Sequence, residues 1–202
     1  MTTPISVIIP VFKNAHFLKD ALESLISQTF KKFEIIIVND GSPEEKKIKK
    51  IISKYKIRLN IRYISYKKNR GVSYALNKGI KNSKSQYISW LSHDDFFHPK
   101  KFETQLNFLK SNLKFITLTG FYLVDENKNI LKKMTYRKFK FMPKYQILFR
   151  DNLNLCTALF PRKIFKEIGF FDENKKHIQD YDFMFRIFKK YKLKIINKPL
   201  FF

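Results

Sequence analysis

The chain has 202 residues and carries 41 Lys and Arg against 17 Asp and Glu, which gives a formal net charge of +24. Hydrophobic residues make up 44% of the chain, with 22 Phe, 10 Tyr and one Trp, and this composition excludes wholesale disorder. The single cysteine, Cys156, excludes an intramolecular disulfide and favours a reducing, cytoplasmic location.

The first half of the chain alternates between predicted strands and predicted helices. Apolar, β-branched runs predict strands at 5–12, 33–38, 61–66 and 87–91. Apolar residues at helical spacing predict helices between them, at 17–26, 44–55 and 72–81. This order is typical of an α/β fold with a mostly parallel sheet that helices cover on both faces.

The second half is more mixed. Pro99 precedes a predicted helix at 100–109, and two extended runs at 115–125 and 130–136 predict a hairpin. Further along, the pattern predicts an extended run at 155–160, helices at 162–168 and 179–191, and a strand at 194–196. We expect one domain over residues 1–202, with halves at about 1–98 and about 99–202.

Positive charge is concentrated in two parts of the chain. Eleven Lys and Arg lie between Lys46 and Arg70, and eight more lie between Lys128 and Arg150, where aromatic residues separate them. Nucleic acid, an anionic membrane and phosphorylated small molecules would all be attracted by such charge. A compositional bias toward lysine is the alternative. No run of 18 apolar residues is present, so any membrane contact is expected to be peripheral.

The few acidic residues are more informative than the many basic ones. Asp94 and Asp95 follow a hydrophobic strand, and two adjacent carboxylates favour a divalent cation that relieves their repulsion. Helix capping is the alternative for this pair. Asp40 follows another strand, where turn formation is the alternative, and Asp180 begins a predicted helix, where it could stabilise the helix dipole.

Taken in order, these motifs resemble those of family 2 glycosyltransferases, the inverting group with the GT-A fold, here of an envelope-polysaccharide type. The resemblance covers nearly the whole chain. Its motifs are SVIIPVFKN at 6–14, SQTF at 27–30, FEIIIVNDGS at 33–42, NRGVS at 69–73, YISWLSHDD at 87–95, GFFDE at 169–173 and QDYDFMFR at 179–186.

The resemblance implies a GT-A, Rossmann-like sheet and a division of roles between the halves. Residues 1–98 would bind the nucleotide sugar and residues 99–202 the acceptor. The implied nucleotide-sugar contacts are Pro10, Phe12, Asp40, Arg70 and Asp94. Asp95, with Asp94, would bind Mg²⁺ or Mn²⁺, and Asp180 would be the general base.

Three positions depart from the family pattern. Ser92 stands where many members have the first Asp of the DxD motif, and Leu76 stands where an Arg is common. Gln179 replaces the usual Glu before the catalytic Asp. Family members also commonly continue beyond the position of Phe202, so acceptor contacts could lie outside this sequence.

The predicted function is therefore an inverting, metal-dependent transfer of a sugar from a nucleotide-diphosphate sugar to an envelope glycan or lipid-linked acceptor. A UDP-sugar is the leading candidate donor. The 128–150 segment could rest on an anionic membrane surface. One alternative is a basic, non-catalytic binding module for anionic lipid or nucleic acid, although no nucleic-acid-binding signature is present, and another is an inactive glycosyltransferase homologue.

Overall fold

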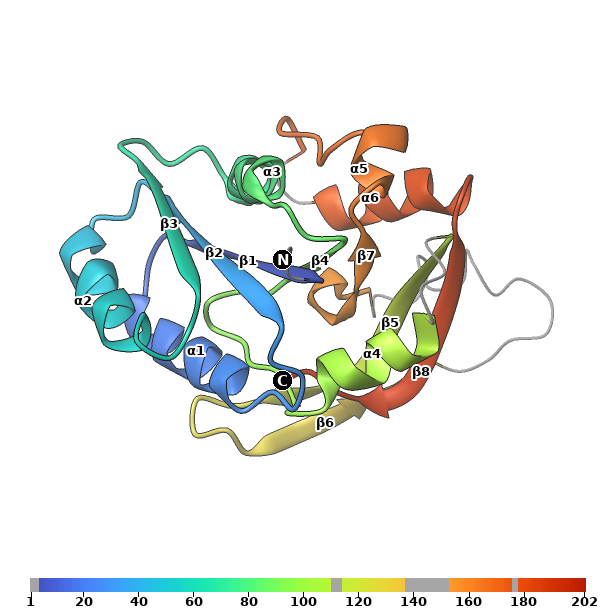
Figure 1. The fold of residues 1–202 in the computed structure, drawn as a ribbon, viewed down its shortest axis with the longest axis horizontal. Helices are drawn as coiled ribbons and strands as arrows, with labels where there is room; N and C mark the ends of the chain where they lie inside the picture. Colours follow the sequence, from blue (N-terminus) through green and yellow to red (C-terminus); the bar gives the residue numbers. More distant parts are fainter. Residues whose placement is uncertain (1–3, 110–113, 137–152, 176–177) are drawn as a thin grey trace.

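The computed structural model describes residues 4–109, 114–136, 153–175 and 178–202. A five-stranded sheet forms its centre, with the strand order β3-β2-β1-β4-β7 (Figure 1). The first four strands are parallel and β7 is antiparallel to β4. The strands are β1 (Ile5–Val11), β2 (Phe33–Asp40), β3 (Ile61–Tyr66), β4 (Tyr87–Trp90) and β7 (Phe160–Pro161).

Helices cover both faces of this sheet, as the alternating pattern predicts. Figure 1 shows α3 (Val72–Asn82) on one side and α1 (Leu18–Ile26) and α2 (Glu45–Tyr55) on the other. All eight residues of β2 are buried, which is expected of a strand covered on both faces. Gly79 lets α3 approach the sheet, because a Cβ there would lie 2.3 Å from Cγ2 of Ile8.

A second sheet has the strand order β6-β5-β8. Strands β5 and β6 form an antiparallel hairpin, as predicted, whereas β8 runs parallel to β5. The strands are β5 (Phe115–Val124), β6 (Ile130–Met134) and β8 (Lys192–Pro199). Within the described residues, the remaining helices are α4 (Lys101–Leu109), α5 (Ile164–Glu167), α6 (Gln179–Phe188) and the short 3-10 helices η1 (Ala15–Phe17) and η3 (Leu155–Thr157).

The two sheets are joined through several backbone contacts. Thr117 of β5 and Leu159, which precedes β7, exchange backbone hydrogen bonds of 3.4 and 3.0 Å. Phe96 and Phe202 exchange two more, each 2.9 Å long. The segment that follows the Asp94–Asp95 pair is thereby held by residues more than a hundred positions further along the chain.

One predicted element was wrong. The 155–160 run was expected to be extended, but it begins as the 3-10 helix η3 and only Phe160–Pro161 pairs as a strand. Asn154 explains the turn, because its side-chain oxygen accepts a hydrogen bond of 2.9 Å from the backbone N–H of Cys156. The helix predicted to end at 191 ends at Phe188, and the last strand is longer than predicted.

Candidate functional site

The carboxyl ends of β1, β2 and β4 surround a pocket of about 310 Å³. Open parallel sheets bind ligands at this edge. We call it the strand-end pocket. Four of the predicted nucleotide-sugar contacts line it, namely Pro10, Phe12, Asp40 and Asp94. The structure thus brings together residues that are up to 84 positions apart in the sequence.

Asp40 has a clear local role in this pocket. Its carboxylate accepts hydrogen bonds from the backbone N–H groups of Arg70 (2.8 Å) and Gly71 (2.9 Å) and from the Asn69 side chain (3.0 Å). These bonds fix the loop that leads into α3. Gly41 also shapes this contact, since its φ is +67° and a Cβ would lie 2.5 Å from the Lys68 carbonyl carbon.

Arg70 does not line the strand-end pocket. Its guanidinium carbon lies 3.7 Å from the centre of the Tyr74 ring, a cation–π contact on the exposed loop before α3. The neighbouring Leu76 points into the core and is 1% exposed. The side chain at position 76 therefore brings no charge to the pocket.

Asp94 and Asp95 lie in the turn after β4, and α4 begins only at Lys101. They therefore do not cap that helix. The Asp94 side chain is 57% exposed, whereas Asp95 is half-buried. Burial, together with the adjacent Asp94 carboxylate, raises the pKa of Asp95 to about 7.

Asp95 and Asp180 line a second pocket of about 380 Å³, which we call the aspartate pocket. Asp180 lies in the first turn of α6, as predicted. Burial raises the pKa of Asp180 to about 6, although a hydrogen bond from the Leu155 backbone partly opposes this effect. Its Oδ1 is buried and has no hydrogen-bond partner among the described residues.

The two pockets meet at the turn after β4, since Ser92 lines both of them. The hydroxyl of Ser92 lies 3.4 Å from Sγ of Cys156, which is buried. Ser92 therefore borders both the pocket lined by Pro10 and Phe12 and the pocket lined by Asp180.

Comparison with known proteins assigns the chain to a family. The family described as Glycosyl transferase family 2 matches it over residues 6–192. The chain belongs to that family. An uncharacterized glycosyltransferase of Rickettsia prowazekii is 40% identical over 92% of this chain and 58% of its own length. One of Methanocaldococcus jannaschii is 33% identical over 97% of this chain and 69% of its own length.

Solved structures confirm the GT-A fold predicted for this family 2 glycosyltransferase. The crystal structure of residues 1–349 of TarS from S. aureus matches it with a TM-score of 0.80 at 19% identity, over 100% of this chain and 60% of that one. TarS has also been solved in complex with UDP and with UDP-GlcNAc. The chain spans between about a quarter and three fifths of its Rickettsia relatives.

The family 2 pattern did not reveal every residue of the aspartate pocket. Cys156 of η3 and Asn154, which directly precedes η3, line it, but no sequence signal places that short helix beside Asp95. Trp90 also lines it from the end of β4. Trp90 could have been noticed as the sole tryptophan, four residues before Asp94.

The donor set of this glycosyltransferase fits a metal held jointly with a substrate. No group of three or more His, Cys, Asp or Glu side chains gathers into a metal site within the described part of the chain. Mg²⁺, however, is commonly held by only one or two carboxylates, with phosphate oxygens from the substrate. The Asp94–Asp95 pair matches that requirement. His93 is bonded instead to the Lys13 carbonyl, at 2.6 Å.

Proposed function

We propose that the chain transfers a sugar, with inversion, from a nucleotide-diphosphate sugar to a hydroxyl of a glycan or lipid-linked acceptor. The observation that carries this proposal is the meeting of the two pockets at the turn after β4. One has the residues expected around a nucleotide, and the other holds the carboxylate of Asp180, whose Oδ1 is buried. The UDP-GlcNAc complex of TarS supports a UDP-sugar as donor.

In this proposal each residue acts through its own chemistry. Pro10 and Phe12 provide an apolar wall for the base, and Asp40 holds the loop that closes the strand-end pocket. Asp95, with Asp94, would hold Mg²⁺ or Mn²⁺. When bound, such an ion offsets the charge of the diphosphate leaving group.

Asp180 would act as the general base. The acceptor oxygen forms a bond with the anomeric carbon while the bond from that carbon to the diphosphate breaks on the opposite face. The acceptor proton passes to Asp180. A positioned base of this kind contributes about 10²- to 10⁴-fold to a rate. Burial suits the role, because a carboxyl with a raised pKa holds a proton more readily than an exposed aspartate.

The first test concerns Asp180. We expect Asp180→Asn to lower transfer by at least about 10²-fold and to leave UDP binding unchanged. Asp182→Asn is a matched control on the same helix, because Asp182 is held by Lys175 and Arg186 and does not line the aspartate pocket. Full turnover by Asp180→Asn would remove Asp180 from the role of base.

A second test concerns the donor. UDP, dTDP and GDP are titrated calorimetrically with and without Mn²⁺ or Mg²⁺. We expect at least one nucleotide to bind more tightly with metal, and Asp95→Asn to abolish that difference. If no nucleotide binds under any condition, the proposed function is wrong.

Peripheral membrane contact is a further part of this proposal. On β6, Ile130 and Leu131 are 57% and 68% exposed, beside the exposed Lys132 and Lys133. Apolar side chains next to basic ones suit the surface of an anionic bilayer. Within the described residues, none of the helices combines the length and apolarity needed to span one. Residues 137–150 of the predicted contact segment lie outside the described residues.

A further inference from the structure

The aspartate pocket contains a hydrogen-bond donor that has no acceptor. Trp90 lines this pocket and is 8% exposed. Its indole Nε1 is buried, and no described residue accepts a hydrogen bond from it. Buried polar groups are nearly always hydrogen-bonded, so an exception in a pocket calls for an explanation.

Asp180 provides the complementary exception in the same pocket, because its buried Oδ1 accepts no hydrogen bond from the described residues. An indole N–H can only donate, and a carboxylate can only accept. A ligand satisfies both when it carries an oxygen that accepts and a hydroxyl that donates. Sugars present both groups at close spacing.

The surrounding structure holds Trp90 firmly. Trp90 is the last residue of β4, and its backbone lies opposite Ile8 of the neighbouring strand β1. The Trp90 ring packs edge-on against the Phe171 ring, with the two ring centroids 6.0 Å apart. Phe171 is fixed in turn, since its backbone N–H and carbonyl both bond to the Asn77 side chain, at 3.0 and 2.9 Å. A rigid donor of this kind discriminates between substrates better than a mobile one.

The location indicates which sugar would meet Trp90. The aspartate pocket adjoins the strand-end pocket through Ser92, and Asp95 lines it. A nucleotide in the strand-end pocket, with its diphosphate at the aspartates, would extend its sugar toward Trp90. We propose that Trp90 is a specificity-determining residue whose indole N–H donates a hydrogen bond to an oxygen of the donor sugar. This inference rests on the proposed function.

The sole tryptophan makes the inference directly measurable, because all indole fluorescence comes from Trp90. The wild-type chain is titrated with UDP and with UDP-glucose, UDP-galactose and UDP-GlcNAc, each with Mn²⁺. We expect at least one UDP-sugar to shift the emission maximum beyond the change that UDP causes. If UDP and every UDP-sugar bind and produce the same emission change, the inference is overturned.

The second experiment replaces the indole with a smaller aromatic ring that has no N–H. We expect Trp90→Phe to weaken binding of the responding UDP-sugar by about 3- to 10-fold and to leave UDP binding unchanged. Tyr87→Phe is a matched control, since Tyr87 lies on the same strand and its buried hydroxyl also lacks a described partner, but it does not line the aspartate pocket. We expect this control to bind both ligands like the wild type.

The outcomes distinguish the inference about Trp90 from the proposed function. Equal loss of UDP and UDP-sugar binding in Trp90→Phe would assign Trp90 a structural role and overturn the inference. An unchanged UDP-sugar affinity would overturn it as well. Absence of any nucleotide binding in the wild type would instead overturn the proposed function. Because the fluorescence titration uses the unaltered chain, it decides the question even if Trp90→Phe does not fold.

Discussion

At the scale of single residues, the aspartates of the candidate site differ in burial and in their hydrogen-bond partners. Asp180 is half-buried and its Oδ1 is shielded from water, whereas Asp94 is exposed and Asp40 is buried and bonded to the loop before α3. In the proposed function, the same side chain would therefore serve as a proton acceptor, a metal ligand or a backbone anchor, according to what surrounds it.

Asp180 leads to a pH prediction. A general base works only when it is unprotonated, and burial raises the pKa of Asp180 to about 6. We expect kcat at saturating donor and metal to rise about tenfold per pH unit below 6 and to level off above it. Stopped assays between pH 5 and 8 measure this profile, and a flat profile would contradict the assignment.

Asp40 leads to a stability prediction. Asp40→Ala leaves the backbone N–H groups of Arg70 and Gly71 without their acceptor, so we expect the free energy of unfolding to fall by about 1–3 kcal/mol. Nucleotide binding should weaken too, because the loop borders the strand-end pocket. Asp125→Ala removes a similar anchor from the β5–β6 turn and should leave nucleotide binding intact, as urea unfolding and calorimetry can check.

At the scale of elements, periodicity explains what could be predicted. The strands and helices of the first half follow their predicted bounds within about two residues, because each buries a regular set of apolar side chains. The 155–160 run was mispredicted, since a single Asn154 side chain bends an apolar stretch into η3. Pairing of β7 with β4 was also unpredictable, as it depends on contacts between distant residues.

The same reasoning applies to the site. Motif order placed Asp94, Asp95 and Asp180 at the ends of a strand and a helix, where they are found. It did not indicate that Arg70 would stack on Tyr74 or that η3 would line the aspartate pocket. Local patterns report which face of an element is apolar, whereas these contacts depend on how elements pack.

Helix α4 contains a buried amine, the side chain of Lys101, which leads to a prediction about stability. Lys101 is 0% exposed; its Nζ donates to Oε1 of Gln105 at 2.6 Å and lies 3.4 Å from the Thr157 carbonyl of η3. No described carboxylate forms an ion pair with it. Burial lowers the pKa of Lys101 to about 7 from the usual 10.5.

The unfolded chain binds a proton at Lys101 up to about pH 10.5, whereas the folded chain loses it near 7. The contribution of Lys101 to the free energy of unfolding therefore increases as the pH rises from 7 toward 10, by at most about 1.4 kcal/mol per pH unit. We expect Lys101→Met to remove this slope in urea unfolding measured between pH 7 and 9. Lys100→Met changes an exposed neighbour and is the control, which should retain the pH dependence of the wild type. An unchanged pH dependence in Lys101→Met would contradict the prediction.

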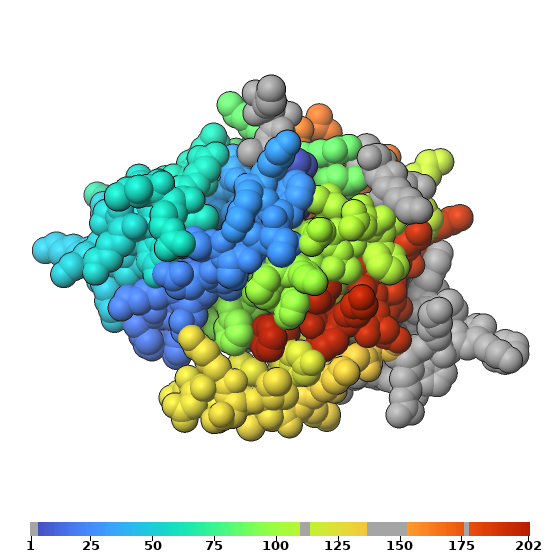
Figure 2. Space-filling model, turned by 60° about the horizontal axis from the view of Figure 1, so that its bottom comes forward, coloured from blue at the N-terminus to red at the C-terminus, as the bar shows by residue number. Residues whose placement is uncertain are grey.

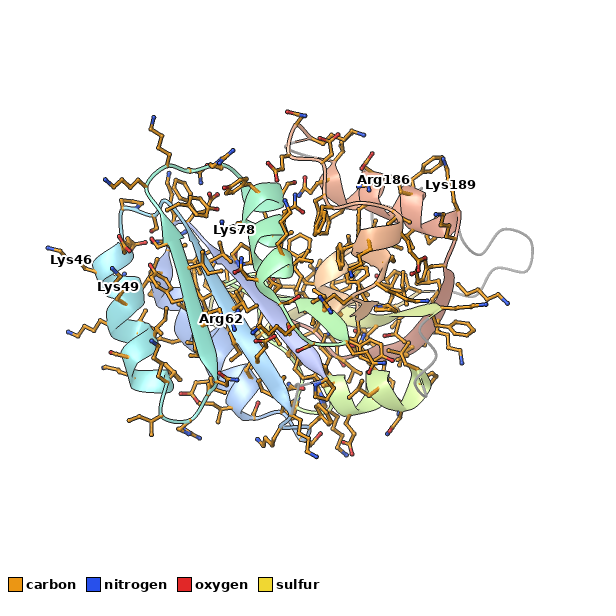
Figure 3. The ribbon with its side chains drawn as sticks, turned by 45° about the horizontal axis from the view of Figure 1, so that its top comes forward. Lys46, Lys49, Arg62, Lys78, Arg186 and Lys189 are labelled. Atoms are coloured by element: carbon orange, nitrogen blue, oxygen red, sulfur yellow. The ribbon has the colours of Figure 1, made fainter. Side chains whose placement is uncertain are left out.

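At the scale of the whole molecule, the positive charge is spread over the surface. Figure 3 shows Lys46 and Lys49 on α2 and Lys189, which directly follows α6, near opposite sides of the structure. Near the candidate site, by contrast, acidic groups dominate. Basic charge combined with exposed apolar residues occurs on β6, along the lower edge in Figure 2.

Membrane contact is predicted to depend on β6. We expect the double change Lys132→Ala and Lys133→Ala to weaken binding to vesicles of phosphatidylglycerol by up to about 30-fold, at about 1 kcal/mol per lysine. Lys46→Ala with Lys49→Ala removes the same charge from α2 and should have a smaller effect. Equal effects in sedimentation assays would mean that only total charge matters.

The pairing of Phe96 with Phe202 has a consequence for biosynthesis. A ribosome makes the chain from its N-terminus, so β1–β4 and the two aspartates are complete long before Phe202 is added. The backbone of the segment after Asp95 acquires its final partner only then. A nascent chain therefore carries Asp94 and Asp95 before the backbone of Phe96 can form its hydrogen bonds, and these bonds require Phe202 to have been synthesised.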